Sequence, residues 1–363
     1  MKKKLIIFNP SIEDGGVEKN LYLITNYLSK QNYDITLISA DISKKKKFNA
    51  SIKFIYPKYI NFKNAGRYKK YLFCSLLLAK QLITNKSSLV FSFQANIYSI
   101  IISKLFFKKI VVRLNTAPQG WDHNFIKNKI YTFFIQKADS IIVNSKKFKD
   151  EVEYRYRVNA HLILNPFNFN EIKKKSKQKI NLQFFKKRDL KIVNAARLTS
   201  QKDHLTLLKA INIVKKFRNI RLIIIGKGIC KNRILKFINK NNLSKNVKLV
   251  GFKENPFKYI AKCDVFVLTS IFEGHPNVLV ETLSLKKFVI STNCPTGPKE
   301  ILNNGKYGDL FKPKDFKKLA KLLIKFKYNS INKKKIINGY KSLRIYDYKK
   351  QCKKYLDILK INN

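Results

Sequence analysis

Strand-like runs that alternate with helical patterns constrain this chain more than any other feature. In the first half, short β-rich runs recur, and the amphipathic segments Glu18–Lys30 and Arg67–Thr84 lie between some of them. The strands predicted there are Lys4–Phe8, Ile35–Ser39, Leu89–Ser92, Ile110–Leu114 and Ser140–Asn144. A βαβ order of this kind predicts a parallel sheet covered by helices.

The same rhythm restarts after a polar, lysine-rich stretch near Asn170–Asp189. The strands predicted in the second half are Lys191–Ala195, Arg221–Ile225, Val247–Val250, Asp264–Thr269 and Phe288–Ser291. A length of 363 residues exceeds a typical single domain. Two doubly wound α/β domains are therefore predicted, 1–170 and 190–330, with 171–189 as a linker. In such folds the ligand lies at the carboxyl ends of the strands, so a ligand cleft between the domains is expected.

The charge of the chain is strongly positive. Lys and Arg number 76 against 22 Asp and Glu, a net charge of +54, which suits nucleic acid, an anionic membrane surface or phosphorylated substrates. The lysines are spread along the whole chain, which indicates in part a compositional bias. No zinc-finger, RNP or helix-turn-helix pattern is present, so no specific nucleic acid is expected as a partner. Neither glycine loop continues as G-x-G-x-x-G, which disfavours a Rossmann oxidoreductase.

Cysteine usage and hydropathy predict a cytoplasmic protein. The five cysteines form no C-x-x-C or Cys/His spacing, which indicates neither a disulfide framework nor a zinc site. The first apolar run stops at Phe8, too short for the core of a signal peptide. Charged residues interrupt the longest apolar region, Leu89–Leu114, so no spanning helix is expected. The protein is predicted to be soluble or peripheral.

Two glutamates flank a Gly-x-Pro-Asn turn between Ser270 and Ile301. A loop punctuated by Gly274 and Pro276 follows the predicted strand, and helical spacing begins at Asn277, a residue suited to capping. The N-terminus of this helix would face the loop and can bind a phosphate.

The positions of the two carboxylates suit sugar binding. Glu273 lies on the loop, and Glu281 lies one turn into the helix near the face of Asn277 and Val278. Carboxylates at that strand edge can hold sugar hydroxyls.

Two more loops follow predicted strands with residues suited to phosphate. Gly15 and Gly16 open the helix after the first strand, and paired glycines permit positive φ and close backbone approach. Arg197 and Lys202 follow the strand Lys191–Ala195. Both cations can neutralise the charge that develops on a nucleoside diphosphate leaving group.

The segment from Glu273 onward resembles the donor-site signature of family 4 glycosyltransferases, E-G-x-P-N-x-x-x-E followed by P-x-G-x-x-E-I. The loop at Gly15 is similar to the family's G-G-x-E, and the stretch around Arg197 to its G-R-L-x-x-x-K, with Ala196 in place of the usual glycine. Gly226-Lys227-Gly228 resembles a G-x-G turn whose centre is commonly acidic. The acceptor half, before Asn165, is matched only by its first loop and its βαβ rhythm.

This resemblance implies a GT-B fold of two Rossmann-like domains, with C-terminal helices at 331–363 that pack back on the first domain. It implies a retaining, front-face transfer from a nucleotide sugar, with a UDP-sugar expected in preference to a GDP-sugar. The implied roles are sugar hydroxyls for Glu273, ribose for Glu281, phosphates for Arg197 and Lys202, and donor contacts for Gly15, Gly16, Gly251, Gly274, Asn277 and Val278. Many relatives carry a histidine where this chain has Asn115, with Arg113 close by, and both are expected on the acceptor side.

No metal is expected. The four histidines, His123, His161, His204 and His275, show no ligand spacing, and no D-x-D motif is present. The negative charge on the leaving diphosphate would then be stabilised by cationic side chains of the protein.

The acceptor is expected to be a glycan or a lipid-linked sugar in cell-surface polysaccharide or lipopolysaccharide synthesis, as the resemblance implies. Arg67–Lys80 joins a basic, aromatic entry to an apolar helix. That composition fits docking on an anionic membrane at its cytosolic face, and it equally fits a helix that packs its leucines on the sheet. The alternatives are a basic module that binds nucleic acid or membrane without transferring a sugar, and an inactive scaffold.

Overall fold

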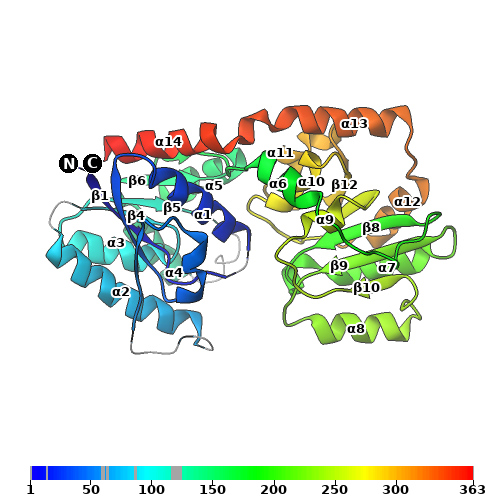
Figure 1. Ribbon diagram of the computed structural model, residues 1–363, viewed down its shortest axis with the longest axis horizontal. Coiled ribbons are helices and arrows are strands. Elements are labelled where there is room, and N and C mark those ends of the chain that lie inside the picture. Colours follow the sequence, from blue (N-terminus) through cyan, green and yellow to red (C-terminus); the bar gives the residue numbers. More distant parts are fainter. Residues whose placement is uncertain are drawn as a thin grey trace. The chain divides into compact units, whose positions relative to one another are not determined.

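The computed structural model describes residues 2–13, 15–58, 62, 65–85, 88–115 and 125–362, apart from the side chains of 125–127. The chain divides into two compact units, each with its own parallel sheet (Figure 1). Unit 1 comprises Met1–Phe167 and Tyr346–Asn363, and unit 2 comprises Asn168–Ile345. Each unit is described by itself.

Unit 1 contains a seven-stranded parallel sheet in the order β3-β2-β1-β4-β5-β6-β7. Its strands are β1 (Lys3–Phe8), β2 (Tyr33–Ile38), β3 (Lys53–Ile55), β4 (Ser88–Ser92), β5 (Ile110–Arg113), β6 (Ser140–Val143) and β7 (Ala160–Leu162). Its helices are α1 (Gly16–Leu28), η1 (Ile42–Lys47), α2 (Arg67–Thr84), α3 (Asn96–Leu105), α4 (Phe125–Ile135), α5 (Lys146–Tyr156) and α14 (Tyr348–Ile361).

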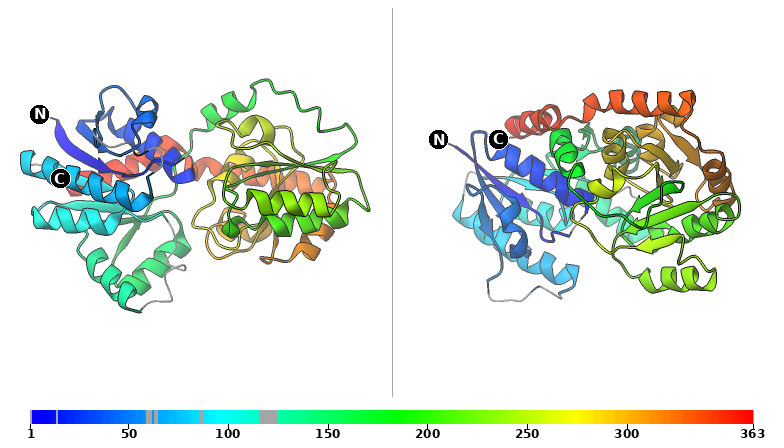
Figure 2. Two further views of the ribbon diagram at one scale, coloured as in Figure 1. Left: turned by 90° about the horizontal axis from the view of Figure 1, so that it is seen from below. Right: turned by 45° about the vertical axis from the view of Figure 1, so that its right-hand side comes forward.

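Helices cover both faces of this sheet (Figure 2). Alternate residues of β1 point to opposite faces. Leu5 and Ile7 join the core formed with α1 and α14, whereas Ile6 and Phe8 join the core beneath α2 to α5. Burial on both sides explains why the strands read as continuous apolar runs.

Unit 2 contains a six-stranded parallel sheet in the order β10-β9-β8-β11-β12-β13. Its strands are β8 (Leu190–Ala195), β9 (Ile220–Ile225), β10 (Val247–Leu249), β11 (Val265–Leu268), β12 (Phe288–Thr292) and β13 (Asp309–Phe311). Its helices are α6 (Phe169–Ser176), η3 (Ser200–Lys202), α7 (His204–Val214), α8 (Lys231–Lys240), α9 (Phe257–Ile260), α10 (Asn277–Ser284), α11 (Pro298–Ile301), η4 (Asn303–Gly305), α12 (Phe316–Lys325) and α13 (Ser330–Lys341), and η5 (Ser342–Tyr346) leads out of the unit.

The unit boundaries differ from the predicted ones in two places. Residues 171–189, predicted as a linker, begin inside α6, which buries Ile172 and packs on α9 and α10 of unit 2. Residues 331–345 also belong to unit 2, and only Tyr346–Asn363 joins unit 1, where α14 packs on α1. The sequence does not predict α6 because this two-turn helix buries only Ile172 and is otherwise rich in lysine, so it has no apolar periodicity.

Strand order reverses once in each sheet. β1 lies between β2 and β4, and β8 lies between β9 and β11. Connections leave in opposite directions at such a point, so the loops part at the carboxyl ends of the strands and leave room for a ligand. In unit 2 the loops that part are those carrying Lys202 and Glu273.

Candidate active site

A buried ion pair occupies the point where the strand order of unit 2 reverses. Lys202 follows β8 and Glu273 follows β11, and the Lys202 Nζ lies 2.5 Å from the Glu273 Oε1. The Lys202 side chain is 15% exposed and that of Glu273 is 7% exposed. The Ser270 hydroxyl donates to the same carboxylate oxygen at 2.6 Å. A buried carboxylate needs such partners because it has lost water.

Hydrogen bonds join the two loops that carry this pair. The Thr269 hydroxyl at the end of β11 donates to the Lys202 carbonyl at 2.9 Å. The Ile271 N–H donates to the Gln201 carbonyl at 2.8 Å, and the Gln201 amide donates to the Phe272 carbonyl at 2.8 Å. Lys202 is thus fixed through its backbone to the neighbouring strand, and its ammonium group is held at one place.

A third loop, after β12, lies against the Glu273 loop. The Glu273 N–H donates to the Pro295 carbonyl at 3.4 Å, and the Thr296 hydroxyl donates to the Glu273 carbonyl. Gly297 has φ +84°, and a Cβ there would lie 2.6 Å from the Pro276 Cδ and 2.7 Å from the Gly274 carbonyl oxygen. The Pro-Thr-Gly segment therefore requires glycine at 297 for two independent reasons, its backbone conformation and its lack of space.

Helix α10 begins at Asn277, as predicted, but the prediction that Asn277 caps it is wrong. Pro276 is the N-cap, and no side chain caps the first turn. Pro276 removes one N–H donor of the entrance by itself, so the helix can begin without an asparagine cap. Asn277 and Glu281, one turn apart, are 8% and 3% exposed, and Val278 is half-buried. The helix N-terminus and a buried carboxylate thus lie on one short element.

The glycine turns of unit 2 lie at the same edge of the sheet as Arg197. The Leu198 N–H donates to the Lys227 carbonyl at 2.9 Å, and the Gly226 N–H donates to the Gly251 carbonyl at 3.0 Å. A Cβ on Gly226 would lie 1.9 Å from the Ala196 carbonyl oxygen, so only glycine permits this approach.

The side chains of this edge are open to solvent. Arg197 is exposed, and the Lys227 Nζ lies 5.0 Å from the centre of the Phe252 ring. The structure therefore brings Arg197 and Gly251 to one edge through the glycine turn.

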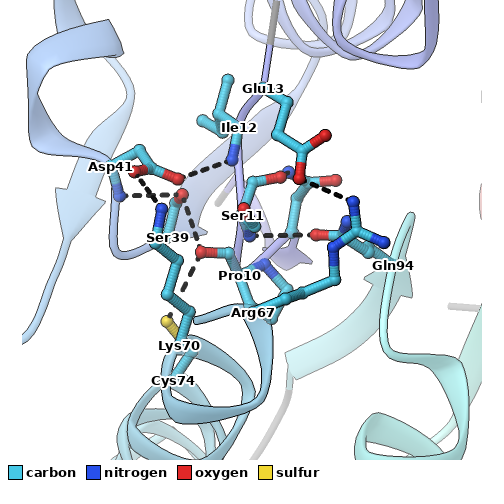
Figure 3. A network of polar contacts seen from close by, with 11 residues as sticks. Pro10, Ser11, Ile12, Glu13, Ser39, Asp41, Arg67, Lys70, Cys74 and Gln94 are labelled. Carbon is cyan, nitrogen blue, oxygen red and sulfur yellow. Dashed lines mark hydrogen bonds and ion pairs between the residues drawn. The ribbon is translucent and has the colours of Figure 1, made fainter. Parts of the chain in front are cut away.

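In unit 1 the loop after β1 is held by contacts from three other segments, which are the loop after β2, helix α2 and the loop after β4 (Figure 3). The Ser11 N–H donates to the Gln94 side chain at 2.9 Å, and the Ile12 N–H donates to the Asp41 carboxylate at 2.7 Å. Asp41 also accepts from the Lys70 Nζ at 2.6 Å. The loop is fixed well before Gly15.

The expectation of positive φ at Gly15 is wrong. Gly15 is extended, with φ −140°, and it is the N-cap of α1, which starts at Gly16. A Cβ on Gly15 would lie 2.8 Å from a carboxylate oxygen of Glu18. Glycine at this position leaves room for the carboxylate of Glu18, the glutamate of G-G-x-E. Close approach of this loop to a ligand stays a prediction.

Arg113 does not lie where it could contact an acceptor. Its side chain is fully buried and donates to Tyr355 at 2.9 Å, to Asn165 at 2.6 Å and to Asn115. Asn115 in turn donates to the Phe93 carbonyl at 2.6 Å. Arg113 therefore positions Asn115, which is half-buried at the end of β5. The remaining segment after it, 116–124 with His123, lies outside the described residues.

Two family models match the chain, one for each half. The model of glycosyltransferase family 4 matches residues 14–171, and that of glycosyl transferases group 1 matches residues 174–342. The chain is a group 1 glycosyltransferase.

Known proteins similar to this glycosyltransferase span most of its length. An uncharacterised glycosyltransferase of Methanocaldococcus jannaschii is 32% identical over 62% of this chain and 64% of its own. The N-acetylgalactosamine-N,N'-diacetylbacillosaminyl-diphospho-undecaprenol 4-alpha-N-acetylgalactosaminyltransferase of Campylobacter jejuni is 28% identical over 84% of this chain and 85% of its own. The solved structure of Anabaena HepE in complex with UDP and glucose superposes with a TM-score of 0.82, 18% identity and 99% of each chain covered. The predicted GT-B fold is thereby confirmed.

Sequence reasoning missed three residues of the glycosyltransferase's site. Ser270, Thr296 and Gly297 hold the Glu273 loop from two sides. Thr296 and Gly297 belong to the P-x-G-x-x-E-I segment, whose pattern by itself indicates no role for either residue. Ser270 lies three residues before Glu273, a spacing that could have suggested the contact.

No three His, Cys, Asp or Glu side chains gather as a metal site within the part of the chain that the structure describes. Within the same residues, no helix is long and apolar enough to cross a bilayer. Metal-independent transfer and peripheral membrane attachment stay predictions.

His204 makes the stability of the glycosyltransferase depend on pH. It is buried at the start of α7, and neither ring nitrogen bonds to another described residue. Burial, and then the charge of Lys202, lowers the pKa of His204 to about 4. Between pH 6.5 and 4 the unfolded chain binds a proton that the folded chain does not, so stability falls as pH falls. The loss reaches about 3 kcal/mol.

Urea unfolding of the parent and of His204→Met at pH 7.5, 6 and 5 measures this contribution. We expect the parent to lose stability more steeply than the variant, because the carboxylates titrate alike in both. Parallel slopes for the two proteins would show that His204 does not titrate in this window.

Proposed function

We propose that this glycosyltransferase moves a hexose or N-acetylhexosamine from a UDP-sugar to a lipid-linked glycan, with retention at the anomeric carbon and without a metal ion. The Lys202–Glu273 pair carries this proposal, because it places a partly buried cation and a buried carboxylate together where the strand order reverses. Such an edge is where α/β sheets bind nucleotides.

The pair supplies two functions that the reaction needs. The Glu273 carboxylate accepts hydrogen bonds from hydroxyls of the transferred sugar, and the Lys202 ammonium group stabilises negative charge on the leaving diphosphate. Because Lys202 and Glu273 are in direct contact, one bound donor can meet the cation with its diphosphate and the carboxylate with its sugar. Neither group has to form a bond to the sugar.

Other residues extend the donor site from this centre. Arg197 adds a second cation, and Glu281, which lies in α10, binds the ribose hydroxyls. The first N–H groups of α10, at Asn277 and Val278, face a phosphate, which the helix dipole stabilises. We infer that transfer proceeds on one face of the sugar, with the donor phosphate accepting the proton of the acceptor hydroxyl.

The acceptor is proposed from chemistry and from a relative's name. The Campylobacter jejuni relative is named for a diphospho-undecaprenol acceptor. A polyprenyl-linked sugar stays at a membrane surface, so an enzyme with this charge would work bound to the cytosolic face of the membrane. Cell-surface polysaccharide or lipopolysaccharide assembly uses acceptors of that class.

A panel of nucleotide sugars, tested by thermal shift and donor hydrolysis with a chelator present, examines the proposal. One UDP-sugar at about 100 times its Kd should raise Tm by roughly 2 °C or more. Glu281→Ala should abolish the shift, whereas Glu171→Ala, at an exposed glutamate of α6, should retain it.

Two results would count against the proposal. Donor binding that appears only with added divalent metal would remove the metal-independent mechanism. No response to any donor, together with tight and salt-sensitive RNA binding, would favour the basic binding module instead.

A further inference from the structure

Helix α2 exposes a row of apolar side chains along its whole length. Leu72, Leu76 and Ile83 are 56%, 60% and 62% exposed, and the exposed Lys69 and Lys80 lie on the same side of the helix. At 100° per residue these five fall within about 80° of arc. The residues that α2 buries on the sheet are Cys74, Ser75, Leu78 and Leu82. The leucines of this helix thus divide between the core and the surface.

Helix α3 packs beside α2 (Figures 1 and 2) and also exposes apolar side chains. Leu105, on its last turn, is 69% exposed, and Phe107 just beyond it is 95% exposed. Tyr71 of α2 and Tyr98 of α3 have ring centres 5.8 Å apart, which joins the two helices near their N-terminal ends. We call the exposed residues of these helices, together with Phe107, the α2–α3 face.

Phe107 has no folding reason to be a phenylalanine. The Lys108 N–H donates to the Ser103 carbonyl at 2.8 Å and the Phe107 N–H to the Lys104 carbonyl at 3.1 Å, which is a Schellman motif. Phe107 has φ +52°, a left-handed conformation that glycine or asparagine adopts at lower cost. A large ring that is strained and almost wholly in water indicates a function outside the fold.

Positive charge predominates around this face, although Arg67, Lys70 and Lys104 pair with Glu13, Asp41 and Asp139. From Ile42 to Trp121 the sequence contains 16 Lys and Arg and no Asp or Glu. Lysine-rich composition alone does not explain this, because the chain has 22 acidic residues elsewhere. Lys69, Lys80 and Lys109 are exposed within the segment. The face therefore attracts an anionic surface and repels cationic ones.

We propose that the α2–α3 face docks on an anionic lipid bilayer. Aliphatic side chains between lysines match a bilayer interface, where the side chains enter the acyl boundary and the ammonium groups meet anionic headgroups. Nucleic acid offers phosphates and flat bases and leaves Leu72, Leu76 and Ile83 without a partner. The purpose of docking rests on the proposed lipid-linked acceptor, but binding to vesicles does not require that any sugar be transferred.

The docking helix is also tied to the loop after β1. Arg67, on the first turn of α2, donates to the Glu13 carboxylate at 2.6 Å. Lys70 donates to Asp41, which accepts from the Ile12 N–H (Figure 3). A bilayer bound by α2 would thus contact the same helix that holds the loop after β1. A lipid-linked acceptor in that bilayer would reach unit 1 from the bilayer surface.

Vesicle flotation with the full chain tests the proposal. Vesicles of phosphatidylcholine with about one third phosphatidylglycerol should bind the parent at roughly 0.1 M salt, and vesicles of phosphatidylcholine alone should not. Phe107→Asn combined with Leu76→Asn should weaken binding at least tenfold, on the order expected for two half-inserted side chains. Phe107→Asn alone should not lower Tm, because asparagine suits the left-handed position.

Charge is tested in the same assay. Lys69→Gln, Lys80→Gln and Lys109→Gln should each weaken binding about fivefold. The matched controls lie in unit 2: Phe217→Asn at a 67% exposed phenylalanine, and Lys317→Gln, Lys318→Gln and Lys321→Gln at exposed lysines of α12. These variants should bind vesicles as the parent does.

Three results would overturn the proposal: no flotation with anionic vesicles, equal losses from the face and control variants, or RNA binding that displaces vesicles and ignores the apolar substitutions. Donor hydrolysis measured on the same proteins separates this outcome from the proposed function. If the protein hydrolyses a UDP-sugar but does not float with vesicles, only the docking proposal fails. If it floats but binds no donor, only the transferase proposal fails.

Discussion

Lys202→Met is expected to lower kcat by about 10²- to 10³-fold while leaving KM for the donor within a few fold. Methionine keeps most of the apolar length of the lysine and removes its charge. A fixed cation acts most strongly where charge develops, on the leaving diphosphate, so the loss falls on the transition state more than on the bound donor. Steady-state kinetics with the donor identified by the panel measure both constants.

The same substitution has a separate cost in stability. It leaves Glu273, 7% exposed, with the Ser270 hydroxyl but without its cation. Breaking a buried pair by removing one partner destabilises by about 3–5 kcal/mol, because the other charge stays buried. Lys202→Met with Glu273→Gln removes both charges, so the double variant should recover most of the stability and none of the activity.

This divergence separates catalysis from folding. Activity that returns together with stability in the double variant would show that Lys202 acts only through the fold. Lys216→Met, at an exposed lysine just after α7, is the matched control and should change neither quantity.

Most strands could be predicted because burial on both faces makes them continuous apolar runs. All ten predicted strands are present. Among the residues that the structure describes, the sequence did not reveal β3, β7 and β13, which are three-residue strands at sheet edges. Three residues are too few for any periodicity. β10 (Val247–Leu249) is equally short and also lies at an edge, but the apolar Val250 that follows it extends its pattern to four residues.

The sequence predicted which loops carry the site residues, but it did not predict which of these residues contact one another. The sequence predicts Lys202 and Glu273 on separate loops with separate roles. Their ion pair forms because β8 lies beside β11. The βαβ alternation does not determine which strands are neighbours, so it could not predict this contact. Arg113 shows the same limit more sharply. Its partners Asn165 and Tyr355 are 52 and 242 residues away, so nothing near it in the sequence marked it as buried.

Gly297→Ala is expected to lower Tm by about 6–12 °C, the shift that corresponds to a loss of at least about 3 kcal/mol in a unit of this size. Alanine at φ +84° is strained, and its Cβ would overlap the Pro276 Cδ and the Gly274 carbonyl oxygen. The Glu273 loop must move to admit it. Since that loop sets the Lys202–Glu273 pair, kcat should fall as well, even at temperatures where the variant is folded.

Gly305→Ala separates backbone strain from loss of space. Gly305 has φ +91°, close to that of Gly297, but nothing lies within 4 Å of a Cβ built there. It should therefore lose only the strain contribution, about 1–2 kcal/mol, and retain its kcat. If both alanine variants lose the same stability and keep their activity, the contact between the Pro-Thr-Gly segment and the Glu273 loop does not hold the site. If only Gly297→Ala loses activity, the Glu273 loop and the Pro-Thr-Gly segment after β12 act as one unit. The Glu273 loop can then keep its geometry only while residue 297 has no side chain.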